Sequence, residues 1–183
     1  MPAAKSSAEK TALVARRVGV VPDFPKPGIL FRDVCPLLKD PEAFNATIEL
    51  LEEKLQKHVG SVDLIAGLEA RGFLFGPSLA ARLGVGFIPL RKKGKLPGET
   101  VAVSYTLEYG QDVVEAQVGA LKPGQNVVIV DDLIATGGTM AAASQLIQKL
   151  GGTVLQCLVV IELVELRGRE LLEADMLQSL LQY

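Results

Sequence analysis

The sequence is poor in the side chains that bind transition metals most tightly. It has a single histidine, His58, and two cysteines, Cys35 and Cys157, which lie far apart along the chain. Structural zinc sites need several cysteines and histidines at short, defined spacings. Because no such spacing occurs, we expect no protein zinc site. We assign His58 to a helix end, where it interacts with the helix dipole or has no special role.

The chain also lacks a long apolar run and an excess of charge. No stretch approaches the roughly 20 apolar residues of a transmembrane helix. The N-terminal segment MPAAKSSAEK has no apolar signal core. The net charge of −2 and the isoelectric point of about 5.5 argue against a general nucleic-acid binder. We expect a cytoplasmic protein with reduced thiols that binds neither nucleic acid nor membrane.

The composition that remains is that of a globular protein. The 183 residues are 49% hydrophobic and 22% charged, which is enough for one domain with a substantial core. We predict a single domain over residues 1–183, with residues 1–7 disordered. The segment VPDFPKPGILFRD carries closely spaced prolines, so it cannot form a regular helix, and we predict an irregular arm there.

Apolar runs alternate with helical patterns along the rest of the chain, which predicts an α/β fold with a mostly parallel, twisted sheet flanked by helices. Ligands bind at the carboxyl ends of the strands in such sheets. The loops EARG, RKKGK and DDLIATGGT each follow a strand directly and should share one edge. The predicted strands are 64–67, 87–90, 101–107, 113–117, 127–130, 153–161 and 177–181; the predicted helices are 8–17, 73–83, a short one at 168–172, and two that start at residue 41 and after the loop ending at residue 139.

The loop between the apolar strand VVIV and the following helix has the composition of an anion site. Its glycines let backbone N–H groups turn toward a common point, and the helix N-terminus adds partial positive charge. We predict that it binds a phosphate group. The loop matches neither the Walker motif nor the dinucleotide fingerprint. Its residues are Ala135, Thr136, Gly137, Gly138 and Thr139.

Two adjacent carboxylates, Asp131 and Asp132, precede this loop. They would repel a phosphate placed on top of them, so they must contact another part of the same ligand. A ribose with two vicinal hydroxyl groups fits, because ionised carboxylates only accept hydrogen bonds. The alternatives are an acid pair that caps a helix and one that holds a metal alone.

Basic side chains follow the predicted strands 64–67 and 87–90. Arg71, with Gly72 behind it, suits bidentate binding of a diphosphate, and we take Arg71 as a candidate catalytic residue. Four more cations, Arg91, Lys92, Lys93 and Lys95, crowd the next loop. Such a cluster is commonly a solvated turn, but beside a ligand with several negative charges it becomes an electrostatic clamp.

The segment VVIVDDLIATGGT resembles the phosphoribosyl diphosphate signature of the type I phosphoribosyltransferases. Further segments are similar to the members of that family that act on adenine, and the resemblance runs from Val14 to Tyr183; these segments are FPKPGILFRD, LIAGLEARGFLFGPSLA, RKKGKLPG, SYTLEYG and LLQY. The resemblance implies a purine-salvage enzyme that converts adenine and 5-phosphoribosyl 1-diphosphate into AMP and diphosphate. It further implies Mg²⁺, carried mainly by the diphosphate, and a homodimer.

The resemblance also implies features of the fold and of the diphosphate site. The sheet would carry a small N-terminal hood at about 18–35 and a flexible catalytic loop at about 95–113. The peptide bond between Glu69 and Ala70, in the loop that holds the leaving diphosphate, would be cis. Lys92 and Lys95 would contact the diphosphate, and Arg91 is similar to a residue that reaches the neighbouring subunit's site. Some relatives carry Asp-Ser in place of Glu69-Ala70, but both versions keep the following Arg-Gly.

Further residues are assigned to the base by resemblance. Glu108 would take the proton from adenine as N9 attacks the sugar, and Tyr109 beside it would contact the base. Leu30 would pack on the adenine ring, Arg32 would read it with backbone groups, and Leu163 would form another wall. Two alternatives stay open: a different purine base (hypoxanthine, guanine or xanthine), or a non-catalytic sensor of 5-phosphoribosyl 1-diphosphate on the same fold.

Overall fold

The computed structural model describes residues 5–107 and 110–183, with the side chains of residues 106 and 107 left out. The chain divides into two compact units, residues 1–53 and 54–183. The prediction of a single domain stays a prediction. Glu108 and Tyr109 lie outside the described residues.

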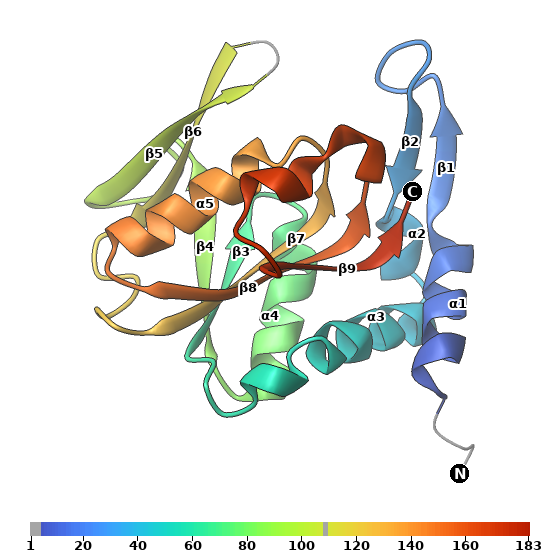
Figure 1. Cartoon of the computed structure of the whole chain (residues 1–183), viewed down its shortest axis with the longest axis horizontal. Helices are drawn as coiled ribbons and strands as arrows, with labels where there is room; N and C mark the ends of the chain where they lie inside the picture. The colour runs from blue at the N-terminus through green and yellow to red at the C-terminus, as the bar shows by residue number, and fades with distance from the viewer. Residues whose placement is uncertain (1–4, 108–109) are drawn as a thin grey trace. The chain divides into compact units, whose positions relative to one another are not determined.

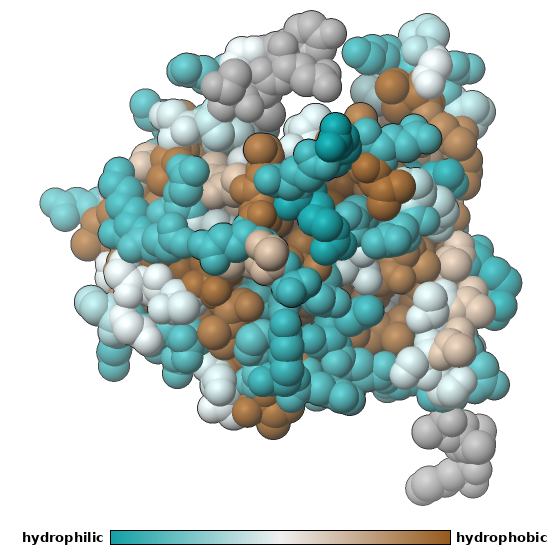
Figure 2. Space-filling model, viewed as in Figure 1, coloured by the Kyte–Doolittle hydropathy of each residue, from teal (hydrophilic) through white to brown (hydrophobic). Residues whose placement is uncertain are grey.

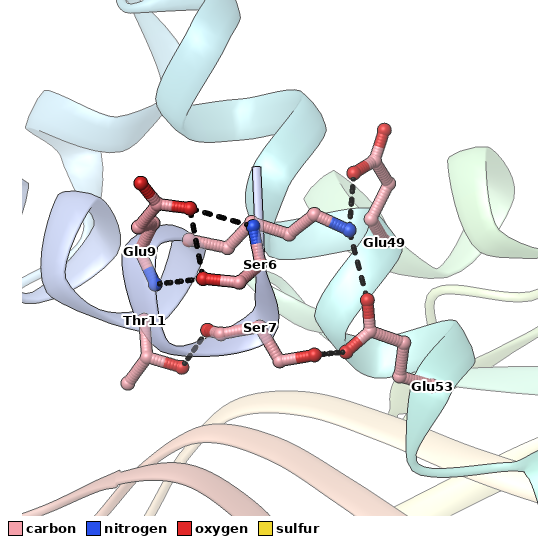
Figure 3. A network of polar contacts seen from close by, with 7 residues as sticks. Ser6, Ser7, Glu9, Thr11, Glu49 and Glu53 are labelled. Carbon is pink, nitrogen blue, oxygen red and sulfur yellow. Dashed lines mark hydrogen bonds and ion pairs between the residues drawn. The ribbon is translucent and has the colours of Figure 1, made fainter. Parts of the chain in front are cut away.

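The first unit begins with helix α1 (Ser7–Arg17), which carries a capping box. The Ser6 side chain accepts from the Glu9 backbone, and the Glu9 carboxylate accepts from the Ser6 backbone N–H at 2.8 Å. Lys10 ties α1 to helix α3 (Pro41–Glu53) through ion pairs of 2.7 Å with Glu49 and 2.8 Å with Glu53. Figure 3 shows this network. The predicted disorder therefore does not extend to Ser6 and Ser7, because both are held by hydrogen bonds.

The proline-rich arm is more regular than the sequence suggested. Strand β1 (Gly19–Pro22) pairs antiparallel with β2 (Leu30–Asp33). Pro22 is the last residue of β1, and Pro25 and Pro27 lie in the connecting loop, which contains a cis Phe24–Pro25 bond. The prediction of a structured but irregular arm is wrong for its two ends, which pair as an antiparallel hairpin. The short helix α2 (Cys35–Leu38) then leads to α3.

The second unit is built on a seven-stranded sheet in the order β5-β6-β4-β3-β7-β8-β9. The pairs β3–β4, β3–β7, β7–β8 and β8–β9 are parallel, whereas β6 pairs antiparallel with both β4 and β5. The strands are β3 (Leu64–Leu68), β4 (Gly86–Lys92), β5 (Thr100–Leu107), β6 (Gly110–Gln117), β7 (Asn126–Ile134), β8 (Thr153–Glu162) and β9 (Leu177–Gln182). The predicted mostly parallel sheet is confirmed.

Helices α4 (Gly72–Leu83) and α5 (Gly138–Lys149) cover opposite faces of this sheet (Figure 1). Ala66 packs in one core cluster with the α5 residues Leu146 and Ile147. The neighbouring Ile65 faces Gly76 of α4 instead, as alternation along a strand requires. Short 3-10 turns complete the unit: η1 (Gln56–His58), η2 (Val164–Leu166) and η3 (Gly168–Leu171).

The apolar run VVIV is buried because β7 has a strand on each side and a helix on each face. Val127, Val128, Ile129 and Val130 are all 0% exposed. Outside the core, hydrophilic residues cover much of the face seen in Figure 2, with hydrophobic patches scattered among them. No helix among the described residues is long and apolar enough to cross a membrane.

Two strands run further than the apolar pattern predicted. Strand β4 continues through Arg91 and Lys92, which pair with residues of β6, and β7 continues through Asp131 and Asp132 alongside β8. These residues were assigned to loops because they are charged. Ladder hydrogen bonds to neighbouring strands extend regular structure past the last apolar side chain, so the charged groups stand on strand ends.

Candidate active site

Three strand ends of the second unit open into one cavity of about 290 Å³. Strand β3 contributes the loop with Glu69 and Arg71, β4 contributes Arg91 and Lys92, and β7 contributes its acid pair and residues 135–139. The prediction that these loops share one edge of the sheet is confirmed. Ala70 and Lys95 do not line the cavity itself.

The predicted phosphate loop is shaped by a contact between two glycines. Gly137 has a φ of 84°, and a Cβ there would lie 2.2 Å from the carbonyl oxygen of Gly168. Side chains other than hydrogen are therefore excluded on conformational and steric grounds. Gly137 is the N-cap of α5, so residues 137–139 present the N-terminus of a helix to the cavity, which favours an anion.

Arg169, the neighbour of Gly168 in the chain, is held in place by a buried carboxylate. Glu162, 4% exposed, accepts hydrogen bonds from Arg169 at 2.6 and 2.9 Å and from Ser179 at 2.7 Å. Leu163 donates its backbone N–H to Ile134 at 3.0 Å, directly before the phosphate loop. The segment that follows β8 thus packs against residues 134–137 and supports the phosphate loop. Leu163 does not line the cavity, so its role as a base wall stays a prediction.

The two acids of β7 differ in their surroundings. Asp132 is 3% exposed and accepts from Arg71 Nε at 2.5 Å. Asp131 accepts from the backbone N–H of Asp132 at 2.8 Å through Oδ1. Burial and the neighbouring Asp132 carboxylate raise the pKa of Asp131 well above its ordinary value. Asp131 and Asp132 both line the cavity.

The raised pKa makes Asp131 a source of instability in the ligand-free protein. Folding favours the neutral carboxyl group of Asp131. The free energy of unfolding therefore falls as the pH rises from 3.8, the ordinary pKa of this group, through its raised pKa in the folded protein. Asp131→Asn, which is neutral at every pH, should raise the free energy of unfolding more at pH 8 than at pH 4. Urea unfolding at pH 8 and pH 4 measures this. A gain of equal size at both pH values, or a loss at pH 8, would contradict the assignment.

The loop after β3 has the predicted backbone. The Glu69–Ala70 peptide bond is cis, as the resemblance implied. Arg71 is the N-cap of α4, and Gly72 begins the helix. A Cβ on Gly72 would lie 2.4 Å from the carbonyl oxygen of Val130. Glycine at 72 therefore lets α4 approach β7 closely enough for Arg71 to reach Asp132.

Glu69 organises the basic residues at the end of β4. Its carboxylate accepts from Arg91 Nε at 3.1 Å, from Arg91 Nη2 at 3.2 Å and from the Lys92 backbone N–H at 3.0 Å. Lys95 Nζ lies 3.3 Å from the same carboxylate. Hydrogen bonding by Arg91 is the main cause that lowers the pKa of Glu69 to about 2. The cluster RKKGK is therefore not a freely solvated turn, because the charged groups of Arg91 and Lys95 both contact Glu69.

The cavity contains two polar residues that sequence reasoning gave no role, Tyr105 and Asp112. They are cross-strand partners on β5 and β6, and the Tyr105 hydroxyl donates to Asp112 at 3.3 Å. Lys92 Nζ lies 3.1 Å from Asp112 on the other side. Burial opposes ionisation of Asp112, but the Val113 N–H and Lys92 hold its pKa below the ordinary value. No local signal in the sequence marks them, because only the register of β5 and β6 places residues 105 and 112 opposite each other.

The predicted contacts of several residues with the base stay predictions. Leu30 and Arg32 belong to residues 1–53, and their contact with a base stays a prediction. Glu108 and Tyr109 lie outside the described residues. Within residues 5–107 and 110–183 there is no group of three or more histidines, cysteines or acids that could hold a metal ion.

Known proteins similar to this chain were found by sequence and by structure. Residues 36–179 match the family model for the phosphoribosyl transferase domain. The adenine phosphoribosyltransferase of Mus musculus is 59% identical over 172 residues, 93% of this chain and 96% of that protein. The one from Rattus norvegicus is 57% identical over 178 residues, 97% of this chain and 99% of that protein.

Solved structures give the same picture. The adenine phosphoribosyltransferase from Thermoanaerobacter pseudethanolicus superimposes with a TM-score of 0.89 at 49% identity, covering 94% of this chain and 99% of that one. The enzyme from Saccharomyces cerevisiae, solved in complex with an imino-altritol bisphosphate and adenine, gives 0.91 at 44% identity, covering 95% of this chain and 99% of that one.

Proposed function

The chain belongs to the phosphoribosyl transferase family, within its adenine phosphoribosyltransferases, and from this membership we propose that it transfers the phosphoribosyl group of 5-phosphoribosyl 1-diphosphate to N9 of adenine. The products are AMP and diphosphate, and the reaction class is that of a glycosyltransferase in purine salvage. The observation that carries this proposal is the cavity in which a phosphate loop, an acid pair and a cluster of cations converge.

The cavity has separate places for the parts of the donor. Residues 135–139 bind the 5′-phosphate with backbone N–H groups at the start of α5. Asp131 and Asp132 accept hydrogen bonds from the ribose hydroxyl groups. Glu69, Ala70 and Arg71, together with Arg91, Lys92 and Lys95, hold the diphosphate. Placing the two anionic groups on different strand ends leaves the anomeric carbon between them.

The reaction is a displacement at that anomeric carbon. Positive charge builds on the ribose as the bond to the diphosphate breaks, and the departing oxygens gain negative charge. Arg71 stabilises those oxygens by bidentate hydrogen bonds. Leu30, Arg32, Tyr109 and Leu163 position adenine on the opposite face of the sugar, and Glu108 accepts its proton.

The chain's own residues fit a magnesium ion that arrives with the donor. Mg²⁺ usually binds phosphate oxygens and water together with one or two carboxylates, rather than a cage made wholly of protein groups. Asp131 and Asp132 line the cavity. Because Asp132 is already paired with Arg71 at 2.5 Å, most ligands of the ion would come from the donor and from water. When bound, the ion would neutralise charge on the diphosphate. Mg²⁺ as cofactor and a cytoplasmic location are both part of the proposal.

The test is a defined reaction. Purified protein with adenine, 5-phosphoribosyl 1-diphosphate and Mg²⁺ should release AMP and diphosphate in equal amounts, as measured by chromatography. Chelation of the metal should stop the reaction, and added Mg²⁺ should restore it. Failure to form AMP under these conditions would refute the proposed function.

A homodimer is the proposed assembly, because Arg91 is similar to a family residue that reaches the neighbouring subunit's site. In this chain Arg91 is bound to Glu69 and to the Lys95 carbonyl oxygen at 3.0 Å. If the homodimer forms, sedimentation at the enzyme concentration of the assay should give the mass of two chains. A fully active monomer would contradict a site shared between subunits.

A further inference from the structure

The cavity holds a carboxylate that the proposed reaction does not use. Asp112, near the start of β6, lines the same cavity as Arg71 and Lys92. Its Oδ2 lies 3.1 Å from Lys92 Nζ and 3.3 Å from the Tyr105 hydroxyl. A negative side chain is unexpected where the substrate itself carries several negative charges, because like charges at short range repel.

The sheet register fixes Asp112 in this position. Lys92 of β4 pairs with Val114 of β6, and Asp112 stands two residues before Val114. Side chains two apart on a strand share a face, so Asp112 and Lys92 project from the same side of the sheet. Tyr105 is the cross-strand partner of Asp112 on β5 and projects from that side as well. The ladder therefore places Lys92, Asp112 and Tyr105 on one side of the sheet, where the ion pair forms.

The contacts continue to the phosphate loop. Thr139 Oγ1 donates to the Tyr105 hydroxyl at 3.4 Å, and Asp112 Oδ1 accepts from the Val113 N–H at 2.8 Å. Thr139, Tyr105, Asp112 and Lys92 thus form a line of polar groups from the 5′-phosphate site to the diphosphate site. Two different elements hold the Asp112 carboxylate toward Lys92, which keeps it near the cation when no ligand is present.

We propose that Asp112, positioned by Tyr105, is an internal counter-ion that occupies Lys92 and competes with the diphosphate for it. This inference rests on the proposed function, which makes diphosphate a ligand of the cavity. A diphosphate that binds Lys92 must displace Asp112 or accept its repulsion. Asp112 consequently weakens the binding of diphosphate, which favours its release as a product.

Calorimetry with magnesium diphosphate as the probe tests this directly. Asp112→Asn keeps the size of the side chain and the oxygen that accepts from Val113, but it removes the charge. Diphosphate should then bind about three- to tenfold more tightly, the range expected for loss of a partly exposed competing ion pair. Glu173→Gln, which removes one negative charge from an exposed residue outside the site, should leave the affinity unchanged.

Two further measurements separate competition from a general effect of charge. Ribose 5-phosphate, which uses the phosphate loop and the acid pair, should bind Asp112→Asn as it binds the wild type. In a Lys92→Ala background, Asp112→Asn should give no gain, because the cation that the two anions share is absent. Unchanged or weaker diphosphate binding in the single variant overturns the inference, and so does a gain that persists without Lys92.

Failure of this inference is distinguishable from failure of the proposed function. A wild-type protein that makes AMP, combined with an Asp112→Asn variant of unchanged diphosphate affinity, removes only the counter-ion role. A wild-type protein that makes no AMP removes the proposed reaction, whatever the calorimetry shows.

Discussion

Glu108→Gln should slow the formation of AMP in a single turnover by roughly 10²–10⁴-fold, the usual cost of losing a general base. Glutamine keeps the size and much of the polarity of glutamate but cannot accept the proton that leaves adenine. Affinity for the donor should barely change, because residues 131–139 and the cations lie on other segments. Single-turnover kinetics are required, since slow release of AMP would hide a change in the chemical step.

A competing account makes Glu108 a latch that holds the catalytic loop shut. The pH profile separates the two roles. A base produces an acidic limb in the single-turnover rate, and this limb disappears in Glu108→Gln, whereas a latch leaves it in place. Alanine at 108 is a poorer test because it changes the size of the side chain as well as its charge. An unchanged single-turnover rate in Glu108→Gln would end the base assignment and leave proton removal to water or to the bound diphosphate.

The double replacement of Asp131 and Asp132 by asparagine should weaken binding of the donor by roughly 10²–10⁴-fold. Two charge-assisted hydrogen bonds to ribose hydroxyls are lost, at about 1.5–3 kcal/mol each. The change also removes the partner of Arg71, which lies 2.5 Å from Asp132. Removal of the two negative charges also lowers the repulsion of the anionic donor, which opposes these losses. Arg71 already neutralises the charge of Asp132, however, so the loss of the hydrogen bonds has the larger effect on affinity.

Fragments of the donor show which part of the ligand the acids contact. By calorimetry, ribose 5-phosphate should lose most of its affinity for the double variant, whereas diphosphate alone should bind at least as well as before. Adenine affinity should change little. If the variant binds ribose 5-phosphate normally, the acids do not hold the ribose, and a purely structural role for the pair would take its place.

Much of the second unit follows from the sequence because its signals are local. A run of four β-branched residues, a glycine-rich loop and a helix start follow one another within a few positions, and they locate the apolar part of β7, the loop after it and the start of α5. The meeting of three loops follows from one rule, that parallel strands end at a common edge. The cis Glu69–Ala70 bond was accessible only through resemblance to a family.

What the sequence did not indicate depends on pairing between distant segments. Asp112 and Tyr105 acquire meaning only when β5, β6 and β4 are in register, so that Lys92 reaches Asp112 at 3.1 Å. In the same way, Glu69 becomes the centre of the cation cluster only when β3 lies beside β4. Strand ends were misplaced at Arg91 and Asp131 because charge was taken as a sign of a loop, whereas ladder hydrogen bonds continue through both residues.

The competition among purine bases tests the central claim most directly. Purified protein, 5-phosphoribosyl 1-diphosphate and Mg²⁺ are incubated with adenine, hypoxanthine, guanine or xanthine, and kcat/KM for nucleotide formation is measured for each. A site that hydrogen-bonds the edge of the correct base rejects a mismatched one strongly, so adenine should be preferred by at least roughly 10²-fold. Preference for a 6-oxo purine, or tight binding of the donor with no turnover of any base, would contradict the account.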